Sequence, residues 1–458
     1  MRAGEIHALV GENGAGKSTL AAIAYGAIKP DEGTLVASGS VGLVHQHFKL
    51  IERLRVWENV LLAREPRKGL AIDRAAARLQ VRALSERHGL ALDPDAIVET
   101  LPVGIKQRVE LVRELAREPA VLLLDEPTAA LAPSEIAAFF KTIATLAARG
   151  TAILIVTHKL AEVIAYSQRV TVMRAGKIVA RLDTAHTSVD EIARAMVGGD
   201  IPPLAERATT TRAARLSIAN LNVGEGSAAL RAATFAIAAG EIVGIAGIEG
   251  NGQSMLADAL AGVVAYTGEI TLDGEAIPAS IDPAERIARG IRVIPQDRLH
   301  EALVLDWSIV ENVALGRQRR APLQRRGVID RGVARAYATD VIERFDVRPP
   351  VASAIVGSLS GGNQQKVVVG RALAGEPRLI VAYQPTRGVD IGAATLLQSR
   401  LIEARNVGAA VLLISFELDE IFALADRVLV MFGGAFVGEF ARAQIDRGRI
   451  GALMAGGT

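Results

Sequence analysis

Apolar runs and amphipathic segments alternate along the whole chain. Ile6–Val10, Val121–Leu124 and Thr151–Val156 are nearly continuous apolar runs, typical of strands buried on both faces of a parallel sheet. Segments with helical spacing separate such runs, so each half predicts an α/β fold with helices flanking a sheet. Residues 58–118 are rich in Arg, Ala and Leu and predict a helical subdomain within the first half. Residues 215–241 predict short alternating strands in the second half.

The chain contains an internal duplication. GEIHALVGENGAGKSTL at 4–20 matches GEIVGIAGIEGNGQSML at 240–256. Four further pairs follow in the same order: WENV (57–60) with SIVENV (308–313), LPVGIKQRV (101–109) with LSGGNQQKV (359–367), DEPT (125–128) with YQPT (383–386), and THKL (157–160) with SFEL (415–418). This pattern predicts two homologous domains, residues 1–200 and 213–458, joined by a linker at 201–212.

The two halves differ at their start. The first half begins three residues before Gly4, whereas residues 213–239 precede the matching point in the second half. The first domain therefore lacks a counterpart of that β segment. We expect the native gene to continue in frame upstream of Met1 for about the length of that segment, because uncovered strand edges are a liability.

Composition narrows the classes of function. The 52 basic and 50 acidic side chains give a net charge of +2, so no excess positive charge indicates nucleic-acid binding. The absence of cysteine excludes disulfides, thiolate nucleophiles, iron–sulfur clusters and cysteine zinc sites. The start MRAGEIHALVGENG has no secretory-signal pattern, and apolar runs such as AAVLLISF at 409–416 are far shorter than the roughly 20 residues of a spanning helix. We expect a multidomain cytosolic protein.

A phosphate-binding loop lies between the first apolar run and a helical segment at 20–28. GENGAGKS at 11–18 fits G-x-x-x-x-G-K-[ST] without departure. In such a loop, backbone N–H groups wrap the phosphates, Lys17 reaches the β- and γ-phosphates, and the Ser18 hydroxyl is offered to Mg²⁺. The predicted nucleotide-binding residues are Gly11, Glu12, Asn13, Gly14, Ala15, Gly16, Lys17, Ser18 and Thr19.

Carboxylates and a histidine follow two of the predicted strands. VLLLDEPT at 121–128 places Asp125 and Glu126 at the carboxyl end of a buried strand, where α/β sheets bind ligands. Asp125 can hold Mg²⁺ through water, and Glu126 can act as general base towards an attacking water. His158 follows the run AILIVT and can donate to a γ-phosphate. Gln46 in VHQHF is a candidate ligand of metal and water at a hinge.

A turn of small residues opens a second candidate anion site at 359–367. In LSGGNQQKV, Ser360, Gly361 and Gly362 precede an amphipathic continuation, and Gln364 follows them. Small residues before a helix leave its N–H groups open to an anion, although such caps are frequent.

These motifs together resemble the nucleotide-binding subunits of ATP-binding cassette (ABC) transporters, over nearly the whole chain and as two cassettes in tandem. The resemblance rests on the Walker A loop (11–18), the glutamine loop (Gln46), Walker B (121–126), the switch histidine (His158) and an LSGGQ-type signature at 359–364. The stretches LPVG (101–104), YQPTRGVD (383–390) and ISFELDE (414–420) are similar to bacterial importers of simple sugars and nucleosides. Of these importers, the LPVG stretch favours the nucleoside (basic-membrane-lipoprotein) branch.

The resemblance implies a fold, an activity and partners. Each cassette would be a P-loop NTPase domain with a RecA-like α/β core, an antiparallel β subdomain (incomplete in the first cassette) and a helical subdomain. With ATP and Mg²⁺, the protein would couple hydrolysis to import at the cytoplasmic face of the bacterial plasma membrane, as a peripheral subunit. It would bind two integral membrane permeases, act indirectly with a periplasmic or lipid-anchored substrate-binding protein, and bind no nucleic acid.

Comparison of the two halves predicts that one ATP site is competent. The first-half residues Lys17, Thr19, Asp125, Glu126 and His158 correspond to Gln253, Met255, Tyr383, Gln384 and Phe416. The second half therefore lacks the cation, the metal carboxylate and the base. Its signature is intact, whereas the first half has Pro102 and Val103 in place of Ser360 and Gly361. In the family each signature faces the Walker A loop of the other cassette, which implies one competent composite site and one degenerate site.

Three other functions share some of these features with an importer ATPase. A tandem-cassette ribosome-associated translation factor usually has two intact sites and a long charged connector. A DNA-repair cassette ATPase would need zinc cysteines. A regulatory protein without turnover is disfavoured by Glu126 and His158.

Overall fold

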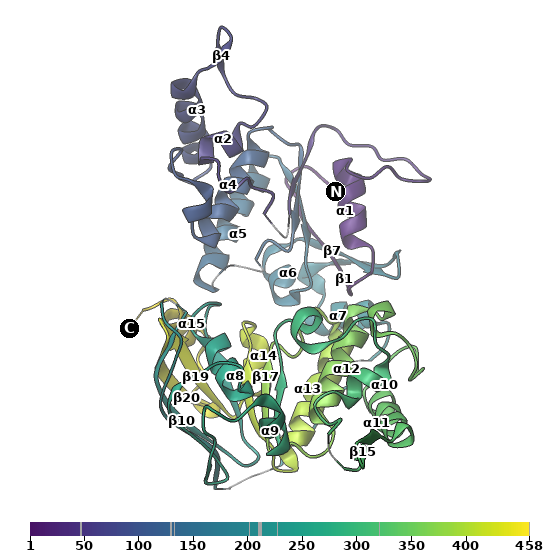
Figure 1. The fold of residues 1–458 in the computed structure, drawn as a ribbon. Coiled ribbons are helices and arrows are strands. Elements are labelled where there is room, and N and C mark those ends of the chain that lie inside the picture. The colour runs from purple at the N-terminus through teal and green to yellow at the C-terminus, as the bar shows by residue number, and fades with distance from the viewer. Residues whose placement is uncertain are drawn as a thin grey trace. The chain divides into compact units, whose positions relative to one another are not determined.

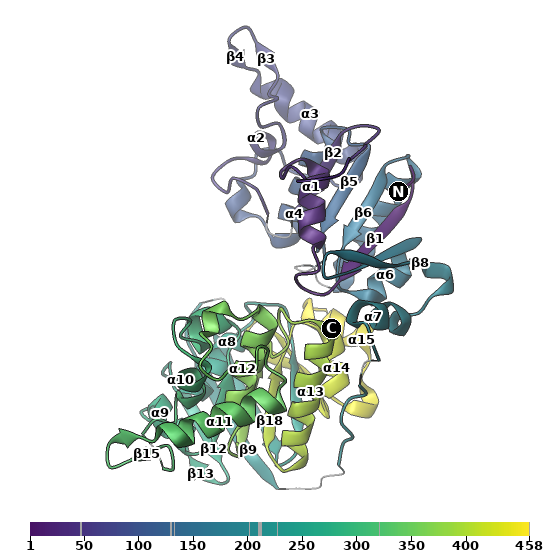
Figure 2. The same cartoon turned by 90° about the vertical axis from the view of Figure 1, so that its right-hand side faces the viewer.

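The computed structural model describes residues 1–45, 48–128, 131, 133–200, 202–208, 213–226, 228–319 and 321–457. The chain divides into two compact units, Met1–Ile201 and Pro202–Thr458. Each unit contains a six-stranded sheet with helices packed against it (Figures 1 and 2). The predicted α/β class, with two cassettes in tandem, is confirmed.

The sheet of the first unit has the strand order β2-β5-β6-β1-β7-β8. All neighbours pair in parallel except β7 and β8, which are antiparallel. The apolar runs found in the sequence form its centre, where β1 and β6 are buried along their whole length. The strands are β1 (Ile6–Gly11), β2 (Val41–Val44), β5 (Val121–Asp125), β6 (Ala152–Val156), β7 (Arg169–Arg174) and β8 (Lys177–Asp183).

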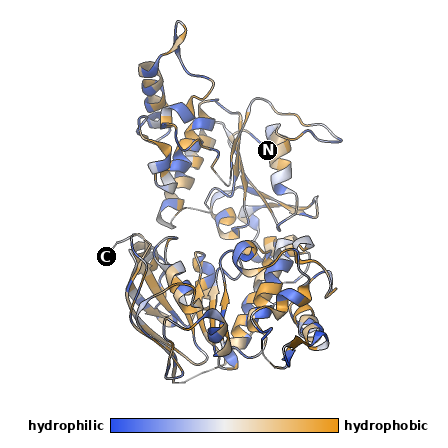
Figure 3. Cartoon of the chain, in the orientation of Figure 1, coloured by the Kyte–Doolittle hydropathy of each residue, from blue (hydrophilic) through white to orange (hydrophobic). Residues whose placement is uncertain are grey.

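Helices of the first unit fall into two groups. One group belongs to the part of the unit that holds the sheet: α1 (Lys17–Tyr25), α5 (Pro133–Ala148), α6 (Leu160–Tyr166) and α7 (Val189–Val197). Between β2 and β5 lies the predicted helical subdomain, made of α2 (Val56–Val60), α3 (Arg74–Arg87) and α4 (Val103–Leu115), of which α4 also packs against β2. Helix α3 is largely hydrophilic in Figure 3 and buries Ala77 and Val81 on one face. The helical periodicity did not predict the small ribbon of β3 (Arg67–Lys68) and β4 (Ala71–Ile72) beside it.

The second unit contains two larger sheets. One repeats the first unit in the order β14-β17-β18-β11-β19-β20, and the other is antiparallel in the order β10-β9-β12-β13. Both contribute to one core, in which Ile218 of β9 and Ile245 of β11 are buried. The strands are β9 (Ala214–Val223), β10 (Leu230–Ala238), β11 (Ile242–Ala246), β12 (Thr267–Leu272), β13 (Glu275–Ala276), β14 (Ile291–Ile294), β17 (Leu379–Tyr383), β18 (Ala410–Ile414), β19 (Arg427–Phe432) and β20 (Ala435–Ala441).

The strands predicted at 215–241 are β9 and β10, and they belong to this antiparallel sheet. In the described part of the first unit no four-stranded sheet corresponds to it, which agrees with the predicted incomplete β subdomain. The helices of the second unit are α8 (Gln253–Ala261), α9 (Pro283–Ala288), α10 (Ile309–Ala314), α11 (Arg331–Arg344), α12 (Gly361–Leu373), α13 (Ile391–Asn406), α14 (Leu418–Leu424) and α15 (Arg447–Met454). A ribbon of β15 (Gln324–Arg325) and β16 (Val328–Ile329) precedes α11.

The described part of the predicted linker, residues 202–208, packs on the second unit. Arg207 Nη1 donates to Asp426 Oδ1 over 3.1 Å, and the Ala208 N–H donates to Asn406 Oδ1 over 3.0 Å. Residues 201 and 209–212 lie outside the described residues, so the linker boundaries stay a prediction. Within the described ranges, no helix has both the length and the apolarity needed to cross a membrane.

Candidate ATP site

The loop between β1 and α1 has the backbone that the glycine spacing predicted. Gly14 and Gly16 have φ values of 80° and 94°, in the left-handed region that favours glycine. A side chain at Gly11 would collide with the carbonyl oxygen of Met173. The turn leads directly into α1, whose N-terminal N–H groups have no intrahelical partner and suit an anion. The other predicted residues on this turn are Glu12, Asn13 and Ala15, followed by Lys17, Ser18 and Thr19 in the first turn of α1.

Lys17 lies inside this loop. Its Nζ donates to the carbonyl oxygens of Gly11 (2.8 Å) and Glu12 (3.0 Å). Burial lowers the pKa of Lys17, while the charges of Glu126 and Asp125 oppose that shift. The ammonium group therefore lies close to both carboxylates at the carboxyl end of the sheet.

Asp125 and Ser18 meet beside the loop. The Ser18 side chain lies near enough to the Asp125 carboxylate to oppose the rise of its pKa. Burial and then the neighbouring charge of Glu126 raise the pKa of Asp125. Mg²⁺ prefers oxygen ligands and commonly takes one or two from protein besides phosphates and water. A carboxylate and a neighbouring hydroxyl fit that requirement. Gln46, the third predicted metal ligand, lies outside the described residues.

Glu126 and His158 form a hydrogen-bonded pair. Glu126 follows β5 with a φ of 48°, and its N–H donates to the Val156 oxygen of β6 over 2.8 Å. Such a backbone is uncommon for a residue with a side chain and is often found at functional sites. His158 Nδ1 lies 2.8 Å from Glu126 Oε1, and Thr157 Oγ1 donates to Glu126 Oε2 over 3.4 Å. The contacts of Lys17, Ser18, Asp125, Glu126 and His158 therefore join them into one cluster in the first unit.

The second unit repeats the loop without its cation. Gln253, at the position of Lys17, is buried, and its Nε2 donates to the Ile248 oxygen over 3.0 Å. Its Oε1 accepts the Asn251 N–H over 3.0 Å. The side-chain amide therefore bonds to the loop at both ends and brings no charge to it.

The strand end beside that loop is apolar. Tyr383, at the position of Asp125, is only 5% exposed, and its ring meets Phe416 edge to face at a centroid distance of 6.1 Å. Gln384 keeps the backbone of Glu126, with a φ of 53° and an N–H bonded to the Ile414 oxygen over 2.8 Å. Its buried Nε2 finds no hydrogen-bond partner among the residues that the structure describes. The duplicated turn thus carries packed aromatic rings where the first unit carries a carboxylate and an imidazole.

The predicted signature forms the start of α12. Ser360 directly precedes the helix and its Oγ accepts from Asn363 Nδ2 over 2.9 Å, while Gly361 and Gly362 open the first turn. Gln364 is buried and its Nε2 donates to the Val356 oxygen over 3.2 Å. In the first unit, α4 begins after Pro102, which has no N–H to offer.

Sequence reasoning missed Arg298 beside this signature. Its Nη1 donates to the Arg387 oxygen over 3.1 Å, and the guanidinium lies against Gly361. Burial lowers the pKa of Arg298. No sequence signal connected it with Gly361, because the two residues are far apart in the chain.

Comparisons with known proteins agree with this geometry. A family model described as "ABC transporter" matches residues 1–129 and 230–387, more than half of the chain. The chain is 38% identical over 476 residues to the nucleoside import ATP-binding protein NupA of Lactococcus lactis subsp. cremoris (strain MG1363), covering 100% of this chain and 94% of that protein. It is 40% identical over 476 residues to the guanosine import ATP-binding protein NupO of Bacillus subtilis (strain 168), covering 100% and 93%.

Sugar importers are similar as well. The ribose import ATP-binding protein RbsA 1 of Rubrobacter xylanophilus is 36% identical over 471 residues, covering 99% of this chain and 93% of that protein. Among solved structures, the archaeal ribosome recycling factor aABCE1, in complex with the ribosomal stalk protein aP1, has a TM-score of 0.67 at 19% identity, over 96% of this chain and 86% of that one. At that identity the likeness concerns the fold alone.

Proposed function

Because the chain belongs to the ABC transporter ATPases, as an ATP-binding subunit of the nucleoside and sugar importer type, we propose that a single competent composite ATP site drives its transport cycle. Lys17, Ser18, Asp125, Glu126 and His158 supply that site from the first cassette. The signature of the second cassette, at Ser360 to Gly362, closes it over the γ-phosphate. The other composite site is degenerate.

The observation that carries this proposal is the distribution of the losses between the cassettes. The second cassette has Gln253, Tyr383, Gln384 and Phe416 where catalysis needs a cation, a metal carboxylate, a base and a histidine. The first cassette has lost its signature at Pro102. When each signature serves the other cassette, both sets of losses fall on the same composite site, and the remaining site is complete.

The proposed roles follow from the contacts of each side chain. Lys17 and the loop N–H groups bind the β- and γ-phosphates, and the turn of α1 orients them. Ser18 and Asp125 would hold Mg²⁺, which when bound neutralises charge that develops on the phosphate oxygens. The Glu126 carboxylate takes the proton of the attacking water. His158, bonded to Glu126 Oε1 over 2.8 Å, orients that carboxylate and can donate to the γ-phosphate.

The proposed partners are two integral membrane permeases, with a periplasmic or lipid-anchored substrate-binding protein acting through them. The chain would then work at the cytoplasmic face of the bacterial plasma membrane. Docking would involve Gln46 and the helical segment from about 51 to 118, so that Gln46 reports phosphate occupancy to the permeases. The cargo would be nucleosides or simple sugars. The names of NupA and NupO, together with LPVG at 101–104, favour nucleosides.

Copurification tests the transport function against the translation-factor alternative. A tagged full-length chain should copurify with two integral membrane proteins and not with ribosomes. Recovery with ribosomal subunits and without membrane proteins would refute the importer function.

Steady-state ATPase of signature variants tests the composite site. Ser360→Arg should nearly abolish hydrolysis, since groups supplied in trans to a phosphoryl transition state can contribute on the order of 10³-fold or more. Pro102→Ala is the matched control in the other signature and should change the rate little. Equal rates for Ser360→Arg and the wild type would refute the proposed composite site.

A further inference from the structure

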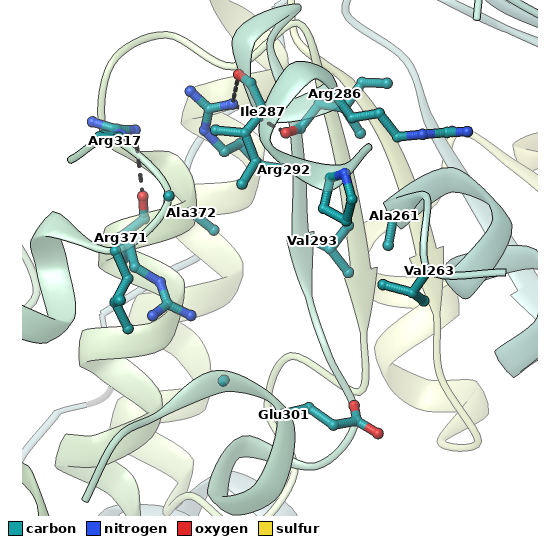
Figure 4. Close-up of a pocket in the computed structure, with 15 residues that line it drawn as sticks. Ala261, Val263, Arg286, Ile287, Arg292, Val293, Glu301, Arg317, Arg371 and Ala372 are labelled. Carbon is teal, nitrogen blue, oxygen red and sulfur yellow. Dashed lines mark hydrogen bonds between the residues drawn. The ribbon is translucent and has the colours of Figure 1, made fainter. Parts of the chain in front are cut away.

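Arg298 lies on a short helical turn, residues 298–302, that follows β14 and packs against α12. The other side of this turn borders a cavity of about 280 Å³, which Glu301 lines (Figure 4). Apolar packing on that side therefore does not fix the turn. Asp297 fixes its start, because its Oδ1 accepts the N–H of Leu299 over 2.9 Å. A side-chain hydrogen bond thus sets the backbone that carries Arg298.

The guanidinium of Arg298 contacts two separate segments of the second unit. One is the signature, where Nε lies 3.5 Å from Gln364 Oε1 and an added Cβ at Gly361 would lie only 2.5 Å from Nη2. The other is the turn after β17, where Nη1 donates to the Arg387 oxygen over 3.1 Å. There an added Cβ at Gly388 would lie 3.1 Å from Nη1. Arg298 therefore bridges the two segments, and a glycine stands at each contact.

This bridge leaves the charge of Arg298 in place. The oxygens that it contacts, one of the backbone and one of a side-chain amide, are both neutral. Burial lowers the pKa of Arg298, the charge of Asp297 opposes that shift, and the charge of Arg387 adds to it. An arginine stays protonated at pH 7 even so. A positive charge therefore lies beside the start of α12.

The first unit has no donor at the matching position. Strands β2 and β14 correspond at an offset of 250 positions, because the first residue of each pairs with the first residue of β5 or β17. At this offset Phe48 corresponds to Arg298, and a phenyl ring has no group that donates a hydrogen bond. Phe48 belongs to the cassette that has Pro102 in place of Ser360. The arginine therefore accompanies the intact signature.

A second link between the same segments is common to both units. Gln365 of α12 donates to the Pro385 oxygen over 2.8 Å, and Gln107 of α4 donates to the Pro127 oxygen. In each unit this link holds the signature helix against the turn that follows the neighbouring strand. The bridge of Arg298 is an addition of the second unit, and it contacts the first residue of the helix.

We propose that Arg298 is a positioning residue for ATP hydrolysis, which holds the signature turn from Ser360 to Gly362 in the arrangement that receives the γ-phosphate. This role rests on the composite site proposed above. Two successive glycines give the turn unusual conformational freedom, so a contact from outside the turn is needed to fix it. Donors that are aimed in advance at developing charge need no reorganisation during the reaction. Arg298 provides that order without touching ATP.

Steady-state ATPase of the full-length chain, measured over a range of ATP concentrations, tests this role. Arg298→Gln should lower kcat about tenfold or more, because small misplacements caused far from the reacting atoms are costly in rate. The KM for ATP should change less than about twofold, since the loop around Lys17 binds the phosphates independently. Arg298→Lys keeps the charge and should retain more of the rate than Arg298→Gln. Arg319→Gln removes an exposed arginine outside the bridge and should match the wild type.

A double-mutant cycle in kcat separates positioning of the signature from general stabilisation of the fold. Ser360→Ala should lower kcat by itself. The double variant of Arg298→Gln and Ser360→Ala should lose less than the product of the two single losses, because both substitutions act on the same turn. The same cycle with Arg298→Lys, the smaller change, decides the question if Arg298→Gln does not fold.

Two results would overturn the positioning role: losses that multiply in the double variant, or a wild-type kcat for Arg298→Gln while Ser360→Arg is inactive. A wild-type rate for Ser360→Arg would instead refute the composite site on which the role of Arg298 rests.

Discussion

Restoring the missing carboxylate of the second cassette should unfold it rather than activate it. In Tyr383→Asp, the substitution removes a ring that is 5% exposed and packs edge to face on Phe416. A tyrosine buries roughly 150–250 Å², which at about 25 cal/mol per Å² corresponds to about 4–6 kcal/mol. An aspartate recovers part of that area but loses an aromatic pair worth about 0.5–1.5 kcal/mol and buries a charge. We expect the second unit to lose about 3–5 kcal/mol.

The two tryptophans allow this loss to be measured in one unit. Trp57 lies in the first unit and Trp307 in the second. In a Trp57→Phe background, urea unfolding followed by fluorescence therefore reports the second unit through Trp307. Tyr383→Phe is the matched control and should change stability by less than about 1 kcal/mol, since it keeps the ring. An unfolding midpoint for Tyr383→Asp equal to that of Tyr383→Phe would refute the packing argument.

Two further predictions concern stability. Without nucleotide, Asp125→Asn should unfold at a higher temperature than wild type at pH 7 but not at a pH below 3.8. Burial raises the folded-state pKa of Asp125 above its ordinary value of 3.8. Wild-type stability therefore falls as the pH rises from 3.8 through the folded-state pKa, whereas asparagine, which does not ionise, does not cause this loss. Melting curves at both pH values check this, and a variant less stable at pH 7 would contradict it. Arg286→Met should destabilise the second unit by about 1–3 kcal/mol, because it removes the guanidinium donor from the Ile281 oxygen and from the Ala259 oxygen, which keeps only the Gly262 N–H; unchanged urea unfolding would contradict that.

The sequence predicted the elements that local pattern controls. Continuous apolar runs marked β1, β5 and β6, and the spacing of glycines marked the turn in which Gly14 and Gly16 adopt positive φ. Because the carboxyl ends of parallel strands lie at one edge of the sheet, the sequence alone assigned Asp125 and His158 to the same site.

Features that depend on tertiary packing were not predictable in this way. Arg298 meets Gly361 only through the fold. The edge-to-face contact of Tyr383 with Phe416 likewise joins two strand ends far apart in the chain. The ion pairs of Arg113 with Glu110 and Glu114 in α4 did carry a signal, since charges at spacings of three and four share a helix face. The burial of these three side chains was not predictable, because it depends on the sheet that packs against this face of α4.

The most direct test of the account compares two substitutions at the same position of the duplicated turn, by steady-state ATPase of the full-length chain. Glu126→Gln should lower the rate by about 10²–10⁴-fold, the usual effect of losing a general base. Gln384→Ala should leave the rate nearly unchanged, and Gln384→Glu should not add a second site while Gln253, Tyr383 and Phe416 remain. Equal losses of ATPase rate from Glu126→Gln and Gln384→Ala would contradict the proposal that one composite site is competent and the other degenerate.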